Sequence, residues 1–186
     1  MSAELRTAVV EAAREMLRLG LVTGTSGNAS ARDGDSVLIT PASMPYDEMT
    51  EDDLVVLGPD GERAEGEGVP SSEWRVHLAI YGARPDLGAI VHTHSVHATA
   101  WSFNDQPLDT GTEELEATTG GAVLTAPYAP TGSEEIANAA VEELGSRGAV
   151  LLGRHGVVGV GRAPAEALAT CVVVERQAQM AWLLRR

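Results

Sequence analysis

The segment Gly88-Ala89-Ile90-Val91-His92-Thr93-His94 is an apolar, strand-like run that ends in two histidines. Residues two apart on a strand point to the same side of a sheet, so His92 and His94 present their imidazoles together. Such a pair is either half of a metal site or two partly buried rings that hydrogen-bond to backbone carbonyls. The segment therefore predicts a buried strand with a candidate site at its end.

The rest of the chain mixes strand-like and helix-like patterns. Helices are predicted for residues 3–19, 72–82, 95–102, 133–145 and 164–184, and strands for residues 28–31, 36–40, 54–57, 122–125, 149–152 and 157–161. Because strands and helices intermingle without strict alternation, a mixed sheet with helices on its faces is favoured. No repeat or low-complexity linker divides the chain, so we expect one domain over residues 1–186.

Composition narrows the possible functions. The 186 residues carry a net charge of −14, and all 13 basic residues are arginine. The acidic balance argues against a nucleic-acid partner, because phosphate backbones require clustered positive charge. The absence of lysine excludes Schiff-base aldolases, pyridoxal-phosphate enzymes and the P-loop lysine. The chain lacks an apolar run of transmembrane length and a signal-peptide-like start, so we expect a soluble, cytoplasmic protein with no membrane partner.

Two further residues extend the candidate metal site. His155 lies in the glycine-bracketed turn Gly153-Arg154-His155-Gly156 between two apolar runs. Alone it is more typical of a surface turn, but together with the other two histidines it favours a metal. Glu73 follows Pro70-Ser71-Ser72 at a predicted helix start, where it is either a capping carboxylate or a further ligand. Three histidines leave an open position on a metal that a carboxylate can occupy.

Hydroxyl-rich segments offer anion binding without lysine. Ser71 and Ser72 at a helix N-terminus can hold a phosphate through hydroxyl and backbone N–H groups, or they serve only as caps. The segment Gly24-Thr25-Ser26-Gly27-Asn28-Ala29-Ser30 is a second such cradle, although glycine-rich loops are more often plain turns. Three other reactive side chains are predicted to be structural or to act behind the ligands: His77, His97 and Cys171.

In this order the motifs resemble the class II, zinc-dependent aldolase family, which also contains sugar-phosphate epimerases and the adducin head domain. The matching motifs are residues 24–30, Ile39-Thr40-Pro41-Ala42-Ser43-Met44-Pro45-Tyr46, Ser71-Ser72-Glu73-Trp74, His92-Thr93-His94-Ser95-Val96-His97, Ala126-Pro127-Tyr128 and His155-Gly156. The resemblance covers about residues 3–183. It implies a three-layer α/β/α fold on a central mixed, largely antiparallel sheet.

The resemblance also implies roles for individual residues. One zinc ion per subunit would be held by His92, His94 and His155. Glu73 would ligate the empty metal and become the catalytic base. The substrate phosphate would be bound by Gly27, Asn28, Ser43, Ser71 and Ser72. The family usually forms a homotetramer with active sites between subunits, and we expect the same here.

The implied reaction is zinc-dependent retro-aldol cleavage of a phosphorylated ketose, either L-fuculose 1-phosphate or a 5-deoxy-pentulose 1-phosphate. Its products are dihydroxyacetone phosphate and a small aldehyde, and a metal stabilises the enediolate that cleavage leaves. A 4-epimerase, a decarboxylase or a dehydratase of the family would use the same chemistry. Epimerases of the family carry Asp where this chain has Glu73, which favours the lyase. An adducin-like scaffold is the non-enzymatic alternative, disfavoured by the intact ligand set.

Two departures from the family pattern concern the ends of the substrate. Thr40-Pro41-Ala42-Ser43 replaces Thr-Pro-Thr-Gly, so one phosphate-binding hydroxyl is lost at Ala42 and Ser43 can restore one. Residues 113–116, all acidic except one leucine, stand where family aldolases carry a tyrosine that handles the aldehyde. The sequence therefore predicts the metal and phosphate ends of the site and leaves the aldehyde open.

Overall fold

The computed structural model describes residues 1–104 and 106–184. Its strands are β1 (Asn28–Asp33), β2 (Ser36–Ile39), β3 (Val55–Leu57), β4 (Arg63–Glu65), β5 (Ala89–Thr93), β6 (Thr125–Ala126), β7 (Ala149–Leu152) and β8 (Gly156–Gly161). Its α-helices are α1 (Ala3–Arg18), α2 (Trp74–Ala83), α3 (Val96–Trp101), α4 (Glu113–Thr119), α5 (Glu134–Leu144) and α6 (Pro164–Leu184). In this described part, no helix has both the length and the apolarity needed to cross a membrane.

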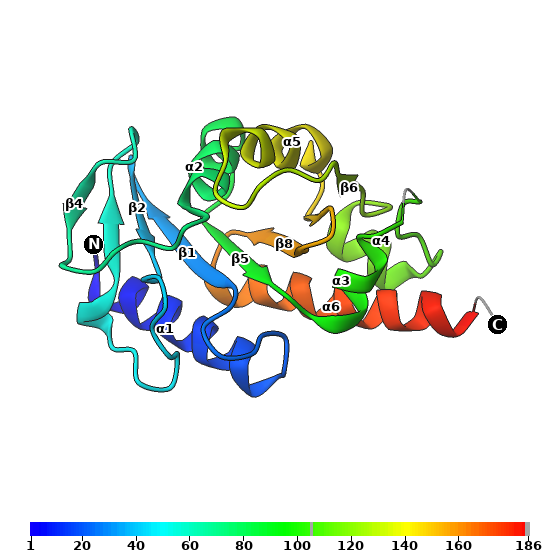
Figure 1. Cartoon of the computed structure of the whole chain (residues 1–186), viewed down its shortest axis with the longest axis horizontal. Coiled ribbons are helices and arrows are strands. Elements are labelled where there is room, and N and C mark those ends of the chain that lie inside the picture. Colours follow the sequence, from blue (N-terminus) through cyan, green and yellow to red (C-terminus); the bar gives the residue numbers. More distant parts are fainter. Residues whose placement is uncertain (105, 185–186) are drawn as a thin grey trace.

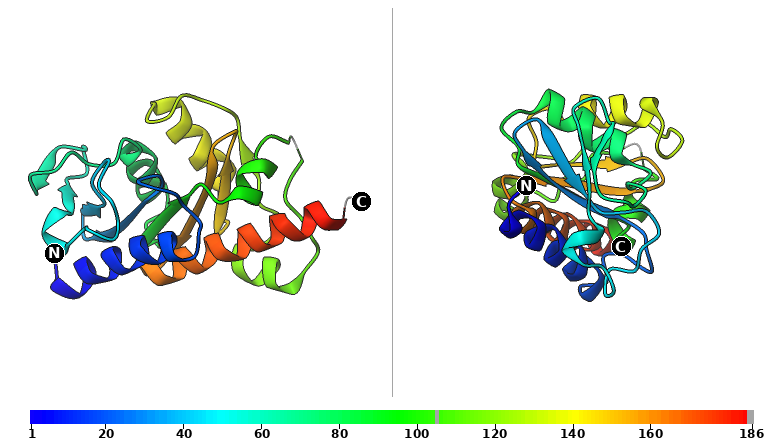
Figure 2. Two further views of the ribbon diagram at one scale, coloured as in Figure 1. Left: turned by 60° about the horizontal axis from the view of Figure 1, so that its bottom comes forward. Right: turned by 90° about the vertical axis from the view of Figure 1, so that its left-hand side faces the viewer.

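The strands form one eight-stranded sheet in the order β4-β3-β2-β1-β5-β8-β7-β6. Neighbouring strands are antiparallel except β6 and β7, which run parallel. Helices α2 and α5 cover one face of the sheet, and α1 and α6 cover the other (Figure 1). Figure 2 shows α1 and α6 lying next to each other along their face. The sequence patterns predict the mixed sheet with helices on its faces, and the family resemblance implies its largely antiparallel α/β/α arrangement; the structure confirms both.

Each face of the sheet has its own hydrophobic core. In β5, Val91 packs toward α1 and α6, whereas Ile90 packs toward α2 and α5. In β8, Val157 and Val158 divide between the two cores in the same way. Strands buried on both faces carry continuous apolar runs, which explains why these segments were recognisable. His92 lies two residues after Ile90, so its side chain emerges on the face covered by α2.

The predicted strands and helices occur with shifts of a few residues, and one further α-helix, one further strand and a short 3-10 helix (Glu51–Asp53) are present. Helix α2 begins at Trp74, so Ser72, which was predicted inside it, lies with Ser71 in the preceding loop. Helix α4 was not predicted, although its N-cap Thr112 accepts a hydrogen bond from the backbone N–H of Leu115 and Gly120 ends it with φ of 72°. Strand β4 is exposed along its whole length, so no apolar pattern marks it.

Candidate metal centre

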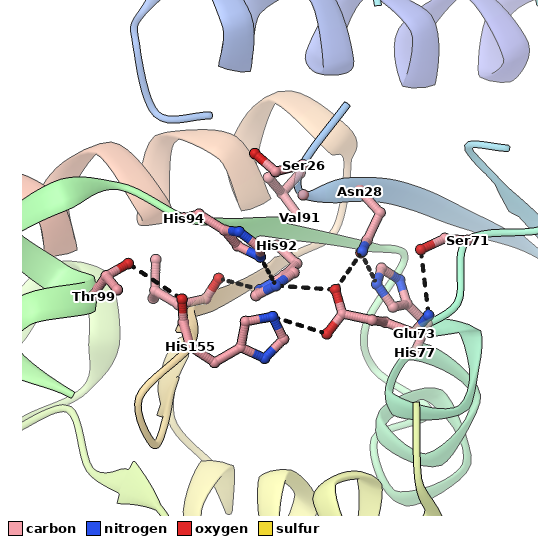
Figure 3. Close-up of polar contacts among 12 residues, drawn as sticks. Ser26, Asn28, Ser71, Glu73, His77, Val91, His92, His94, Thr99 and His155 are labelled. Carbon is pink, nitrogen blue, oxygen red and sulfur yellow. Dashed lines mark hydrogen bonds and ion pairs between the residues drawn. The ribbon is translucent and has the colours of Figure 1, made fainter. Parts of the chain in front are cut away.

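Four potential metal ligands meet at one end of the sheet (Figure 3). His92 lies in β5 and His94 just beyond it, His155 is in the turn between β7 and β8, and Glu73 is the N-cap residue of α2. Because β8 pairs with β5, the turn before β8 reaches the end of β5. One ligand atom from each residue lies within 4.8 Å of all the others. The fold therefore assembles the four residues predicted as ligands.

The ligand atoms of this cluster, the histidine nitrogens and the carboxylate oxygens, point toward a common centre and lie close together. The Nε2 atom of His92 lies 2.9 Å from Nε2 of His94 and 3.1 Å from Oε2 of Glu73. The Nε2 atom of His155 lies 3.5 Å from Oε1 of Glu73. That Oε1 atom is buried and has no hydrogen-bond partner among the described residues. A buried carboxylate oxygen that makes no hydrogen bond and faces imidazole nitrogens fits a divalent transition metal, which would bind all four groups.

Backbone contacts orient the histidine rings. Nδ1 of His92 donates to the carbonyl of Val157 at 2.9 Å, which leaves the Nε2 lone pair free to point into the cluster. Gly156 gives the rings room, because a Cβ atom there would overlap the carbonyl oxygen of Thr93. The same Cβ would lie 3.1 Å from Cε1 of His92 and 3.2 Å from Cδ2 of His94. The glycine after the third histidine is therefore a packing requirement of the centre.

The charges of the cluster favour deprotonated ligands. Burial alone would raise the pKa of Glu73, but the surrounding histidines, His92 first, hold this pKa well below its ordinary value. Burial lowers the pKa of His94 to about 3, helped by its two histidine neighbours, and burial also lowers the pKa of His155. Burial opposes a proton on His92 as well, but the adjacent carboxylate outweighs it and raises that pKa. A metal ion therefore meets two neutral imidazoles and displaces at most one proton.

Two of the segments predicted to bind phosphate run side by side. Pro41 and Pro70 form an antiparallel bridge, which places the loop of Ser43 beside the loop of Ser71 and Ser72. Ser43 and Ser72 are exposed, whereas Ser71 is buried and its hydroxyl accepts a hydrogen bond of 3.4 Å from the backbone at the start of α2. The segment of Ser71 and Ser72 leads directly into Glu73 of the candidate centre, and the loop of Ser43 lies beside that segment.

The third predicted phosphate segment begins β1. Asn28 pairs with His92 across the sheet, and the preceding Gly27 approaches so closely that a Cβ atom would lie 2.6 Å from the His92 carbonyl oxygen. The Asn28 side chain is buried; its Nδ2 donates to Oε2 of Glu73 at 3.0 Å, and its Oδ1 accepts from Nε2 of His77 at 2.5 Å. This contact with the carboxylate was not predicted from the sequence. A phosphate-binding role for Asn28 remains a prediction.

The other two histidines lie outside the ligand set. His77 is buried on α2, with Nδ1 2.6 Å from Oγ of Ser30. His97 is half-buried at the start of α3, and its Nδ1 lies 2.7 Å from Oε1 of Glu175. Cys171 is buried in the core, as its apolar surroundings in the sequence indicate.

Comparison with known proteins defines the class. The sequence profile described as Class II Aldolase and Adducin N-terminal domain matches residues 7–182. The chain therefore belongs to the class II aldolase and adducin family.

Particular relatives narrow this class to aldolases. L-fuculose phosphate aldolase of Escherichia coli O6:H1 is 41% identical over 155 residues, which are 83% of this chain and 72% of the relative. A 5-methylthioribulose-1-phosphate/5-deoxyribulose-1-phosphate aldolase of Rhodospirillum rubrum is 36% identical over 178 residues, which are 96% and 80% of the two chains. The solved structure of an L-fuculose 1-phosphate aldolase matches with a TM-score of 0.95 and 32% identity, over 100% of this chain and 88% of that one. The chain is an enzyme of the class II aldolase type.

Proposed function

We propose that this enzyme cleaves a phosphorylated ketose by a metal-dependent retro-aldol reaction and releases dihydroxyacetone phosphate and a small aldehyde. L-fuculose 1-phosphate and a 5-deoxy-pentulose 1-phosphate are the proposed substrates, supported by the two aldolase relatives. The observation that carries the proposal is the convergence of Glu73 with three histidines within 4.8 Å. Metal chemistry of this kind stabilises the negative charge that carbon–carbon cleavage leaves on the ketone fragment.

Zinc is the proposed metal, one ion per subunit, held by His92, His94 and His155 with Glu73 as the oxygen ligand. Three neutral imidazoles and a carboxylate oxygen are a ligand set that suits zinc. The buried Oε1 of Glu73, which has no hydrogen-bond partner among the described residues, supports this assignment. When bound, the ion supplies a Lewis acid for the substrate oxygens.

Glu73 is the proposed catalytic base. Asn28 and His92 hold its Oε2 atom, while Oε1 has no hydrogen-bond partner among the described residues. After cleavage this oxygen would return a proton to C3 of the enediolate, and in the reverse condensation it would accept that proton from C3 of dihydroxyacetone phosphate. The neighbouring imidazoles keep the carboxylate ionised, which is the state that a base requires. Because the residue is buried, little water competes for the proton.

Phosphate binding is assigned to backbone N–H groups and hydroxyls of Gly27, Asn28, Ser43, Ser71 and Ser72. The bridge between Pro41 and Pro70 holds the loop of Ser43 beside the loop of Ser71 and Ser72, which supports a shared phosphate site. The segment before α2 also brings the positive end of a helix dipole toward an anion, in a chain without lysine.

We also propose a cytoplasmic, single-domain subunit in a homotetramer whose active sites lie between subunits. Large apolar side chains are exposed next to the centre: Val96 is 71% exposed, Phe103 65% and Tyr128 62%. Val96 follows His94 by two residues. The Tyr128 ring lies 5.6 Å from the guanidinium of Arg154, the residue before His155. A second subunit covering this surface would remove it from water. Light scattering of the purified protein tests the assembly.

A cleavage assay over a panel of ketose 1-phosphates tests the function. Dihydroxyacetone phosphate should appear with the zinc-loaded protein and not after chelation. An epimeric ketose phosphate without cleavage products would establish the 4-epimerase instead, and release of carbon dioxide or water from a related sugar derivative would establish a decarboxylase or dehydratase. A protein that holds no metal and turns over none of these compounds would be a scaffold.

A further inference from the structure

A network of hydrogen-bonded, buried polar side chains leads from the candidate base Glu73 into the interior between β1 and α2. Beyond Glu73 and Asn28, Nε2 of His77 lies 2.5 Å from Oδ1 of Asn28, and Nδ1 of His77 lies 2.6 Å from Oγ of Ser30. That hydroxyl lies 2.8 Å from the hydroxyl of Tyr81. None of these residues is more than 5% exposed. Figure 3 shows the part of this network in which Asn28 joins His77 to Glu73 of the metal centre.

The spacing of the two elements explains why these side chains meet. Asn28 and Ser30 lie two residues apart on β1 and point to one face, while His77 and Tyr81 lie four apart on one side of α2. Two strand residues span about 6.6 Å and four helix residues about 6 Å, so the two pairs come into register. Asn28 and Ser30 on the strand therefore both lie opposite His77 and Tyr81 on the helix.

The charge of Glu73 determines the direction of every hydrogen bond in this network. An ionised carboxylate can only accept, so Asn28 must present its amide group to Glu73 and its carbonyl oxygen to His77. That carbonyl also can only accept, so Nε2 of His77 carries a proton. Burial lowers the pKa of His77 to about 3, so the ring is neutral and its Nδ1 accepts from Ser30. The hydroxyl of Ser30 then accepts from Tyr81.

We propose that His77 is a positioning residue of the metal centre, whose Nε2–H holds the Asn28 amide in the orientation that donates to Glu73. The inference rests on the proposed metal centre and adds to it a residue that contacts neither metal nor substrate. Without His77 the amide of Asn28 is free to turn. A turned amide would place its carbonyl oxygen against the carboxylate and repel it from the position that faces the three histidines.

Zinc binding by His77 variants tests this inference. In His77→Leu the donor is lost with similar side-chain volume, and zinc affinity, measured by chelator competition, should fall by roughly 10- to 100-fold. His77→Gln can place an amide nitrogen near the lost Nε2, so its affinity should return to within about 3-fold of the parent protein. Gln177→Leu is the matched control, because it removes a buried side chain whose hydrogen-bond partners Thr110, Thr112 and Glu114 are not residues of the centre. The control should bind zinc as the parent does.

Nitrogen-15 NMR of the metal-free parent protein provides a second, metal-independent measurement. The His77 ring should show a protonated Nε2 and an unprotonated Nδ1, and this result decides the matter if His77→Leu does not fold. A protonated Nδ1, or parent-like zinc affinity in a folded His77→Leu protein, overturns the inference. A parent protein that binds zinc but cleaves no ketose phosphate would overturn the proposed function alone, since both His77 measurements remain valid.

Discussion

The Nε2 atom of His92 lies 3.1 Å from the Oε2 atom of Glu73, and both side chains are buried. His92 lies near the end of the interior strand β5, and Glu73 is the N-cap residue of the helix α2 that covers this face of the sheet. The imidazole of His92 lowers the pKa of the Glu73 carboxyl, and the carboxylate raises the pKa of the His92 imidazole. The carboxylate favours a proton on His92, and a bound cation would compete with that proton. Metal content and acid–base chemistry are therefore coupled at this contact.

His155→Ala should abolish metal binding and turnover, because it removes one of three nitrogen ligands and leaves the buried carboxylate without its third imidazole neighbour. Elemental analysis of the purified protein measures the metal directly. His97→Ala is the control: this half-buried histidine pairs with Glu175 and should be replaceable without loss of metal. Full metal content in His155→Ala would contradict the ligand assignment.

Glu73→Gln should keep the fold and much of the metal, since an amide oxygen can still face the cluster. The side-chain oxygen must also accept from Asn28, so the amide nitrogen is left near His155. Without a base, kcat should fall by roughly 10²–10⁴-fold. Exchange of the C3 proton of dihydroxyacetone phosphate with deuterated solvent should slow in parallel. Exchange at the parent rate would show that another group is the base.

Gly156→Ala should weaken metal binding and destabilise the protein by about 1–3 kcal/mol, because the new methyl group has no space beside Thr93 and the two histidine rings. Gly82→Ala is a matched control near the end of α2, where a Cβ meets nothing within 4 Å. There the same change should be neutral or stabilise the helix by up to about 1 kcal/mol. Urea unfolding and zinc titration of both variants make the comparison. Equal behaviour would mean that the close packing at residue 156 is unimportant.

Ser72→Ala should raise KM for the phosphorylated ketose with little change in stability, because Ser72 is exposed. Ser71→Ala should raise KM and also lower stability, since the buried Ser71 hydroxyl accepts a hydrogen bond from the backbone N–H of Glu73. Inorganic phosphate should compete with substrate in the parent and less so in both variants. If the unphosphorylated ketose were cleaved as well as its ester, the assignment of these serines would be wrong.

Acid should destabilise the metal-free protein partly through His77. Burial lowers the pKa of this histidine to about 3 from an ordinary value of 6.5. Between these values the unfolded chain binds a proton that the folded chain does not, so stability falls as the pH falls below 6.5. His77→Gln should reduce the slope of unfolding free energy against pH in this window by about 1.4 kcal/mol per pH unit. Identical slopes for parent and variant would contradict a neutral, buried His77.

Much of this protein could be predicted from local patterns in the sequence. Apolar runs such as residues 149–152 and 157–161 predicted buried strands, and the interval between His92 and His94 placed both rings on one side. These predictions succeed because strand alternation and helix periodicity are properties of a few neighbouring residues. The short helix α4 was missed despite a local signal, its capping threonine and three acidic residues in the first turn. The exposed strand β4 had no such signal.

The tertiary structure alone decided which segments meet. The pairing of β1 with β5 sets Asn28 opposite His92, and the packing of α2 over β1 places His77 against Asn28. From the sequence, Asn28 was assigned only to phosphate and His77 was predicted to be structural. Neither pattern indicated that His77 contacts Asn28 or that Asn28 contacts Glu73. Strand order and helix packing arise from long-range burial of apolar faces, which a local pattern does not encode. The four residues of the candidate centre were therefore predictable from their motifs, whereas the contacts of Asn28 and His77 behind them became visible only in the folded chain.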